Sequence, residues 1–148
     1  MRLAFLLNGE PFETEAPGDV LLLDLIRWQG LCGTREACGV GVCGACTVLI
    51  DRDPVSSCIY LAGCAQGRQV WTVEGIARRE PDLVEAFIEH EGLQCGACTP
   101  GQLVMAAALR ASGKDPGEAT TRDFLAGNLC RCTGYQSIVD SVRAGLGS

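Results

Sequence analysis

The sequence predicts a mixed α+β fold in its first half and an all-helical fold in its second half. Strand-like runs and one amphipathic helix fill the chain up to about residue 76, and beyond it apolar residues recur at helical spacing. At ~150 residues per domain, the 148 residues form one domain or two halves near the lower limit for an independent core. Halves of this size need a disulfide or a bound metal to stabilise them, and ten cysteines are available to supply one.

The strands of the first half begin with a hairpin. The runs LAFLL (3–7) and PFETEA (11–16) flank Asn8-Gly9, a dipeptide that favours tight turns because both positions tolerate positive φ. Further strands are predicted at 47–50, 55–58 and 69–74, with a turn at 51–54. Such a small mixed sheet needs a helix to cover one face.

That helix is predicted within PGDVLLLDLIRWQG, residues 17–30. Leu22, Leu25 and Ile26 share one helical face. Asp19 is the predicted N-cap and Gly30 the predicted stop.

The second half carries four predicted helices. The first, within residues 80–92, places Leu83, Val84, Phe87 and Ile88 on one face. The second, 99–113, begins with Thr99 as N-cap, Pro100 at the first helical position and Gln102 at the third, the pattern of a capping box. Shorter helices are expected at 121–126 and 136–144.

A first cysteine set follows the predicted helix of the first half. The spacing C-x4-C-x2-C is typical of plant-type [2Fe–2S] ligation, and glycines at 39, 41 and 44 allow the sharp turns that such a loop requires. A structural zinc site fits this spacing poorly. Cys64 competes for the fourth position, but Cys58 is preferred because it ends a predicted strand. The predicted ligands are Cys38, Cys43, Cys46 and Cys58.

A second cysteine set lies in the helical half, in QCGACTPG and NLCRCTGY. C-x2-C combined with C-x-C is compatible with zinc, with a redox dithiol or with an iron–sulfur cluster. The helix that starts just after Cys98 favours an anionic cluster, because its N-terminus carries partial positive charge. The predicted ligands are Cys95, Cys98, Cys130 and Cys132, which leaves Cys32 and Cys64 as small packing residues.

Composition and motifs exclude several functions. The net charge of −6 argues against nucleic-acid binding, and no apolar run approaches the ~18 residues of a membrane span. The N-terminal apolar run is too short for a signal peptide, so a cytoplasmic location is expected. Without a dinucleotide or nucleotide fingerprint, the chain is expected to conduct electrons rather than to bind a substrate.

The chain resembles the small iron–sulfur subunit of the xanthine-oxidase-type molybdenum hydroxylases over nearly its whole length. The segments that carry the resemblance are GTREACGVGVCGACTVLIDRDPVSSC, TVEGIA, LQCGACTPGQLVMAAAL and GNLCRCTGYQSIVDSV. It implies a β-grasp plant-type ferredoxin-like domain (1–76) and a four-helix domain (77–148) with a second, deeply buried [2Fe–2S] cluster.

The resemblance also implies partners and roles. A large subunit would carry a molybdenum–pterin cofactor, and a medium subunit would usually carry FAD. Electrons would leave molybdenum one at a time through Cys95, Cys98, Cys130 and Cys132, and then through the first cysteine set to flavin. Gln94 matches a glutamine that hydrogen-bonds the pterin, and Cys132 matches the ligand nearest to it.

Two other functions compete with this one. A free-standing ferredoxin is disfavoured because residues 77–148 would have no purpose. A zinc-stapled interaction module without redox activity is the alternative from another class, and its metal would be zinc without acid-labile sulfide.

Overall fold

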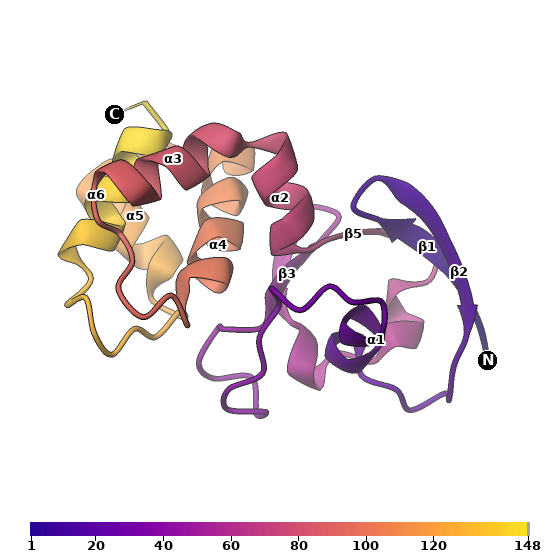
Figure 1. Cartoon of the computed structure of the whole chain (residues 1–148). Coiled ribbons are helices and arrows are strands. Elements are labelled where there is room, and N and C mark those ends of the chain that lie inside the picture. The colour runs from indigo at the N-terminus through magenta and orange to yellow at the C-terminus, as the bar shows by residue number, and fades with distance from the viewer. Residues whose placement is uncertain (148) are drawn as a thin grey trace.

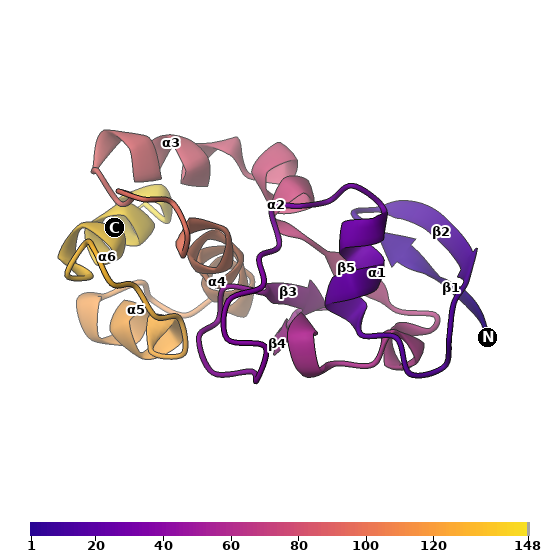
Figure 2. The same ribbon diagram turned by 60° about the horizontal axis from the view of Figure 1, so that its bottom comes forward.

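The computed structural model describes residues 1–147 and consists of two lobes side by side, strands with one helix in the first and helices in the second (Figures 1 and 2). This confirms the predicted α+β fold followed by a helical domain. The elements of the first lobe are β1 (Arg2–Leu7), β2 (Glu10–Glu15), α1 (Leu22–Trp28), β3 (Thr47–Ile50), β4 (Asp53–Ser56), the 3-10 turns η1 (Ser57–Ile59) and η2 (Ala62–Ala65), and β5 (Gln69–Trp71).

The sheet of the first lobe is mixed, in the order β2-β1-β5-β3-β4. The predicted hairpin forms, with Leu7 opposite Glu10 and with Asn8 and Gly9 both at positive φ in the turn. β1 runs parallel to β5 only between Leu6–Leu7 and Gln69–Val70. The first and last strands along the chain, β1 and β5, therefore pair with each other near the centre of the sheet.

Alternation along the strands gives the sheet two different faces. One face packs against α1 in a core that includes Leu3, Phe5, Leu25, Ile26 and Val48. Leu49 points to the opposite face and belongs to the core of the helical lobe. The two lobes therefore share buried apolar surface across β3.

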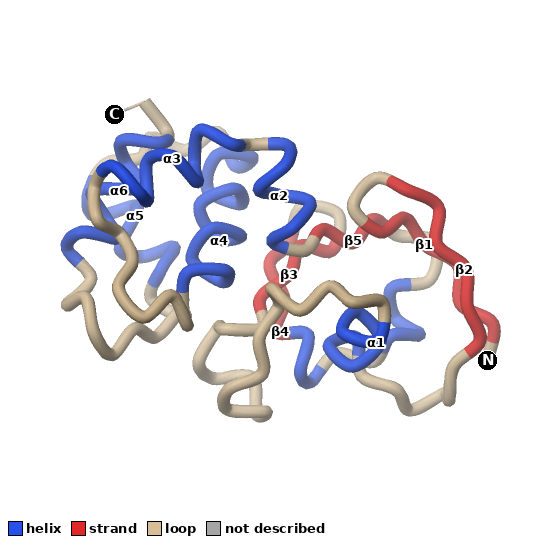
Figure 3. Tube along the Cα trace, viewed as in Figure 1, coloured by secondary structure: helices blue, strands red, loops and turns tan. Residues whose placement is uncertain are grey.

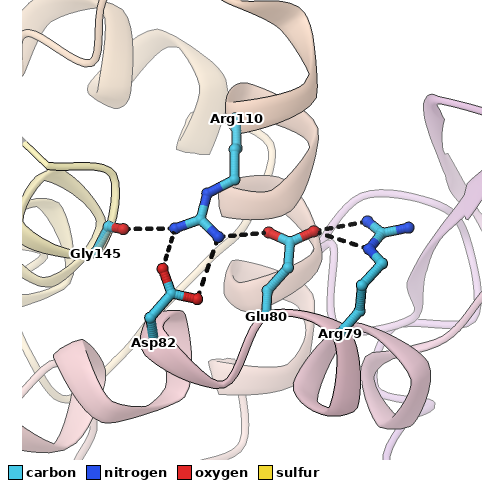
Figure 4. A network of polar contacts seen from close by, with 5 residues as sticks. All are labelled: Arg79, Glu80, Asp82, Arg110 and Gly145. Carbon is cyan, nitrogen blue, oxygen red and sulfur yellow. Dashed lines mark hydrogen bonds and ion pairs between the residues drawn. The ribbon is translucent and has the colours of Figure 1, made fainter.

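The other helices of the second lobe pack around α4. Its helices are α2 (Val73–Arg79), α3 (Pro81–Glu89), α4 (Thr99–Ser112), α5 (Glu118–Leu125) and α6 (Gln136–Gly145). Figure 4 shows Arg110 on α4 reaching Asp82 on α3, the carbonyl of Gly145 on α6, and Glu80, which also binds Arg79. One guanidinium thus joins three helices at the end of the bundle away from the cysteines.

The structure corrects three local predictions in the first lobe. The strand predicted at 55–58 is β4, at Asp53–Ser56, so Cys58 lies in η1 and not at the end of a strand. The strand predicted to run to residue 74 ends at Trp71, and α2 follows at once. Its apolar residues Val73, Ile76 and Ala77 stand at helical spacing, but the β-branched and aromatic residues of QVWTVE favour a strand over the same stretch. Asp19 is not the N-cap of α1, because that helix starts at Leu22 with Leu21 at the N-cap position.

The capping box predicted for α4 does not form. Cys98 occupies the N-cap position in αR conformation, and no side-chain cap bond is present. Gln102 is fully buried and donates from Nε2 to the carbonyl of Asn128, 3.0 Å away, so its side chain is already engaged elsewhere.

The division into residues 1–76 and 77–148 stays a prediction, since α2 spans it and Ser148 lies outside the described residues. Within residues 1–147, no helix is both long and apolar enough to cross a membrane.

Candidate iron–sulfur sites

Both cysteine sets lie on loops at the same side of the molecule. The loop between α1 and β3, the loop between α3 and α4, and the loop between α5 and α6 approach one another there (Figure 3). They line a common cleft of about 340 Å³, to which the first set contributes Cys43 and the second set contributes Cys95, Cys98 and Cys130. Side chains far apart in the sequence are therefore neighbours.

The first set is brought together by a turn rich in positive φ. Gly39, Gly41 and Gly44 adopt φ of 67°, 75° and 74°, a region that L side chains avoid. The chain consequently curls around Cys38 and directs the N–H groups of Val40, Val42 and Cys43 at its sulfur, each 3.4 Å away.

These donors lower the pKa of Cys38 to about 6, with the N–H of Val40 contributing most. Burial instead raises the pKa of Cys58 to about 11. Cys58 lies in η1 and packs with Cys46 and Leu23. The neighbouring Cys43 thiol also lowers the pKa of Cys38, and the Cys46 and Cys38 thiols help to raise that of Cys58, so the four thiols lie close to one another.

The spare cysteines lie elsewhere. Cys64 is exposed in η2, where its carbonyl accepts a hydrogen bond from the Tyr60 hydroxyl at 3.1 Å. Cys32 is also exposed. The structure thus places Cys58, and not Cys64, beside the other three cysteines of the first set.

The four thiols of the second set also lie close to one another. The sulfur of Cys132 lies 3.5 Å from that of Cys95 and 3.9 Å from that of Cys130, and Cys98 lines the same cleft as Cys95 and Cys130. Cys98 is buried, whereas Cys95 and Cys132 are exposed in this chain. The deep burial expected for the second site is therefore not supplied by this chain alone.

Burial raises the pKa of Cys98 to about 12. Burial also raises the pKa of Cys130, but hydrogen bonds from the hydroxyl and N–H of Thr133 outweigh it and bring the pKa to about 7. The N–H of Ala97 lowers the pKa of Cys95. Metal binding at this set must therefore displace protons, most of all from Cys98.

The donor sets fit two-iron clusters. Each contains four thiols on glycine-containing loops with backbone N–H groups aimed at sulfur, which is the environment that stabilises an anionic cluster. In residues 1–147, no three His, Cys, Asp or Glu side chains are gathered as they would be around a single metal ion.

A buried polar junction joins the two sites, and the sequence did not reveal it. Asn128, 4% exposed, donates from Nδ2 to the carbonyl of Gly44 at 2.9 Å. The N–H of Leu129 donates to the carbonyl of Cys43, also at 2.9 Å. Asn128 and Leu129 directly precede Cys130. In the sequence, the asparagine of GNLC was the only polar residue that hinted at such a junction.

Gln94 lies next to Cys95 and is exposed. It lines a cleft of about 550 Å³ together with Phe87, Leu93 and Thr133. The two residues predicted to approach a pterin, Gln94 and Cys132, are therefore both accessible from outside the chain.

Family comparisons agree with this arrangement. Residues 5–69 match the family of 2Fe-2S iron-sulfur cluster binding domains, and residues 72–143 match a second family described as a [2Fe-2S] binding domain. The xanthine dehydrogenase iron-sulfur-binding subunit of Escherichia coli O157:H7 is 43% identical over 92% of this chain and 88% of its own length.

Solved structures show the same fold both as a separate chain and within a longer one. A chain of quinoline 2-oxidoreductase from Pseudomonas putida 86 superposes with a TM-score of 0.92 at 40% identity, covering 99% of this chain and 93% of that chain. The aldehyde oxidoreductase of Desulfovibrio desulfuricans ATCC 27774 matches with a TM-score of 0.92 at 36% identity, covering 98% of this chain but 17% of its own. The chain accordingly belongs to the iron–sulfur subunits of the xanthine dehydrogenase-type molybdenum hydroxylases, a family of oxidoreductases.

Proposed function

We propose that this chain is a one-electron relay within a multisubunit molybdenum hydroxylase. Electrons would pass one at a time from a molybdenum–pterin centre on a large partner subunit to FAD on a medium subunit, or to another acceptor. Two bound [2Fe–2S] clusters would supply the one-electron chemistry. The substrate would be transformed on the large subunit, and the complex would act in the cytoplasm.

The eight clustered cysteines are the proposed ligands. Their grouping into two sets of four thiols supports this assignment. The set nearer to flavin would be Cys38, Cys43, Cys46 and Cys58, and the set nearer to molybdenum would be Cys95, Cys98, Cys130 and Cys132.

The hydrogen bond from the Leu129 N–H to the Cys43 carbonyl is the observation that carries the proposal. Leu129 is covalently joined to Cys130, so a continuous path of one hydrogen bond and about ten covalent bonds links a thiol of each set. Electron tunnelling falls off more slowly along bonds than across empty space, and this junction is therefore suited to transfer between the two sites.

The exposed side of the second set is the proposed docking face for the large subunit. Cys95 and Cys132 are exposed there, and Gln94 lies beside them. In this arrangement the Gln94 amide would hydrogen-bond the pterin, and Cys132 would be the thiolate nearest to it. Docking would also bury the second cluster.

The test is an analysis of metal and sulfide on the anaerobically purified chain, expressed together with the products of its neighbouring genes. We expect about four iron and four acid-labile sulfide atoms per chain, with two separable EPR signals after dithionite reduction. Copurification of a large molybdenum-containing subunit is expected as well.

Other outcomes would contradict the proposal at defined points. About two iron atoms with one signal would limit electron transfer to one lobe. Zinc without acid-labile sulfide would identify a structural module, and a monomer with full cluster content that binds no large subunit would identify a free-standing ferredoxin.

A further inference from the structure

The loop that follows Cys132 contains a tyrosine in an unusual backbone conformation. Tyr135 adopts φ 73° and ψ −27° at the N-cap position of α6, directly after Gly134 at φ 72°. For a bulky side chain this conformation is strained, and it persists only where surrounding contacts hold it. The contacts of Tyr135 therefore indicate what the strain achieves.

The phenol oxygen and the backbone N–H of Tyr135 both contact the preceding loop, at Cys130 and at Thr133. The phenol oxygen accepts a hydrogen bond from the Cys130 N–H at 2.9 Å. The Tyr135 N–H donates to Oγ1 of Thr133 at 3.1 Å. A glycine at position 135 would remove the strain but could not make the first of these contacts.

The bond from Tyr135 orients the hydroxyl of Thr133. Oγ1 also lies 3.0 Å from the sulfur of Cys130, and because it accepts the Tyr135 N–H, its own proton is available for donation to that sulfur. The Thr133 N–H points at the same sulfur from 3.5 Å. A metal-bound thiolate can only accept hydrogen bonds, so Cys130 would receive two donors from one residue.

We propose that Thr133 and Tyr135 are positioning residues that set the reduction potential of the second cluster. The inference rests on the proposed function, in which Cys130 is a ligand of that cluster. Reduction adds one negative charge to the cluster, and donors to a ligand sulfur stabilise that charge more than they stabilise the oxidised form. Thr133 thus raises the potential, and Tyr135 holds Thr133 and the Cys130 backbone in place.

The test is an EPR-monitored redox titration of the full chain with its copurifying subunits. Thr133→Val removes the hydroxyl donor at nearly constant volume, and Thr133→Ser retains that donor. In T133V the ratio of reduced to oxidised second cluster at fixed potential falls about fivefold, the effect of one hydrogen bond of about 1 kcal/mol. In T133S this ratio stays near the wild-type value, and the first cluster is unchanged in both variants.

Tyr135→Phe tests the other half of the proposal. It removes the phenol acceptor while keeping the ring and the backbone N–H, so hydrogen exchange at the Cys130 amide rises about fivefold, the equivalent of one hydrogen bond of about 1 kcal/mol. Unchanged exchange at this amide would show that Tyr135 does not hold the Cys130 backbone.

Three results would overturn the role of Thr133: an unchanged second-cluster potential in T133V, equal shifts of both clusters, or a T133S variant that behaves like T133V. If valine prevents the second cluster from assembling, Thr133→Ala replaces it with the same expected fall. A wild-type chain without a second signal would overturn the proposed function as well, whereas a wild type with both signals and an unshifted T133V overturns this inference alone.

Discussion

At the scale of single residues, the fourth position of the first set allows a sharp comparison. Cys58 is 4% exposed beside Cys46, whereas Cys64 is exposed on the next turn. We expect Cys58→Ser to lose about two of four iron atoms and one EPR signal, because a weaker ligand replaces one of four thiolates. Iron analysis and EPR of the purified variant measure both quantities.

Cys64→Ser is the matched control for this substitution. It changes the same residue type six positions along the chain, outside the cysteine cluster, and should keep the wild-type iron content and both signals. Loss of the first cluster in C64S, with C58S intact, would exchange the roles of the two cysteines.

At the scale of elements, Arg110 fastens the end of the helical bundle. It binds Asp82, the nearly buried Glu80 and the Gly145 carbonyl. Arg110→Met should lower the free energy of unfolding by about 2 kcal/mol, because the buried Glu80 carboxylate loses one of its two charged partners and the Gly145 carbonyl loses its donor. The temperature at which the visible absorption of the clusters bleaches would fall accordingly. Arg2→Met, which removes an exposed pair with Glu13, should leave this temperature close to the wild-type value.

The effect of R110M should not vary between pH 8 and pH 5. The hydrogen bond from Arg110 lowers the pKa of Asp82 below the ordinary value of 3.8 for an aspartate. A group with a lowered folded-state pKa contributes its full stabilisation above the unfolded pKa, and loses it only as the pH falls through the folded value. A difference between variant and wild type that shrinks between pH 8 and pH 5 would show that a group titrating within that range, and not the Asp82 carboxylate, carries the effect.

At the scale of the whole molecule, close backbone packing holds the two lobes together. A Cβ at Gly101 on α4 would come within 2.2 Å of the Gly44 carbonyl oxygen in the first cysteine loop. Gly101→Ala should therefore destabilise the chain by about 1–3 kcal/mol, although alanine usually favours a helix. It should also raise hydrogen exchange at the Leu129 amide and weaken the magnetic interaction between the two reduced clusters.

Gly18→Ala is the control at this scale, since a Cβ there meets no heavy atom within 4 Å. Its stability and its Leu129 exchange should match the wild type within about 0.5 kcal/mol. If G101A also retained wild-type protection at Leu129, the contact between Gly101 and Gly44 would not hold the lobes together.

The sequence by itself determined the fold class, the two cysteine sets and most of the long elements. Cysteine spacing and helical periodicity are local properties, so they can be read along the chain without knowing what each segment packs against. The hairpin at Asn8-Gly9 and the helix beginning at Gln136 follow from such local patterns and appear in the structure as predicted.

Tertiary structure alone decided how the pieces meet. The short helix α2, the inward turn of Gln102, the junction from Leu129 to Cys43, and the strained Tyr135 beside Thr133 all depend on contacts between distant segments. A side chain that can cap its own helix can also bind a carbonyl of another loop, and only the packed fold determines which bond forms. Burial then fixes the choice, because a polar group removed from water must find a partner within the protein.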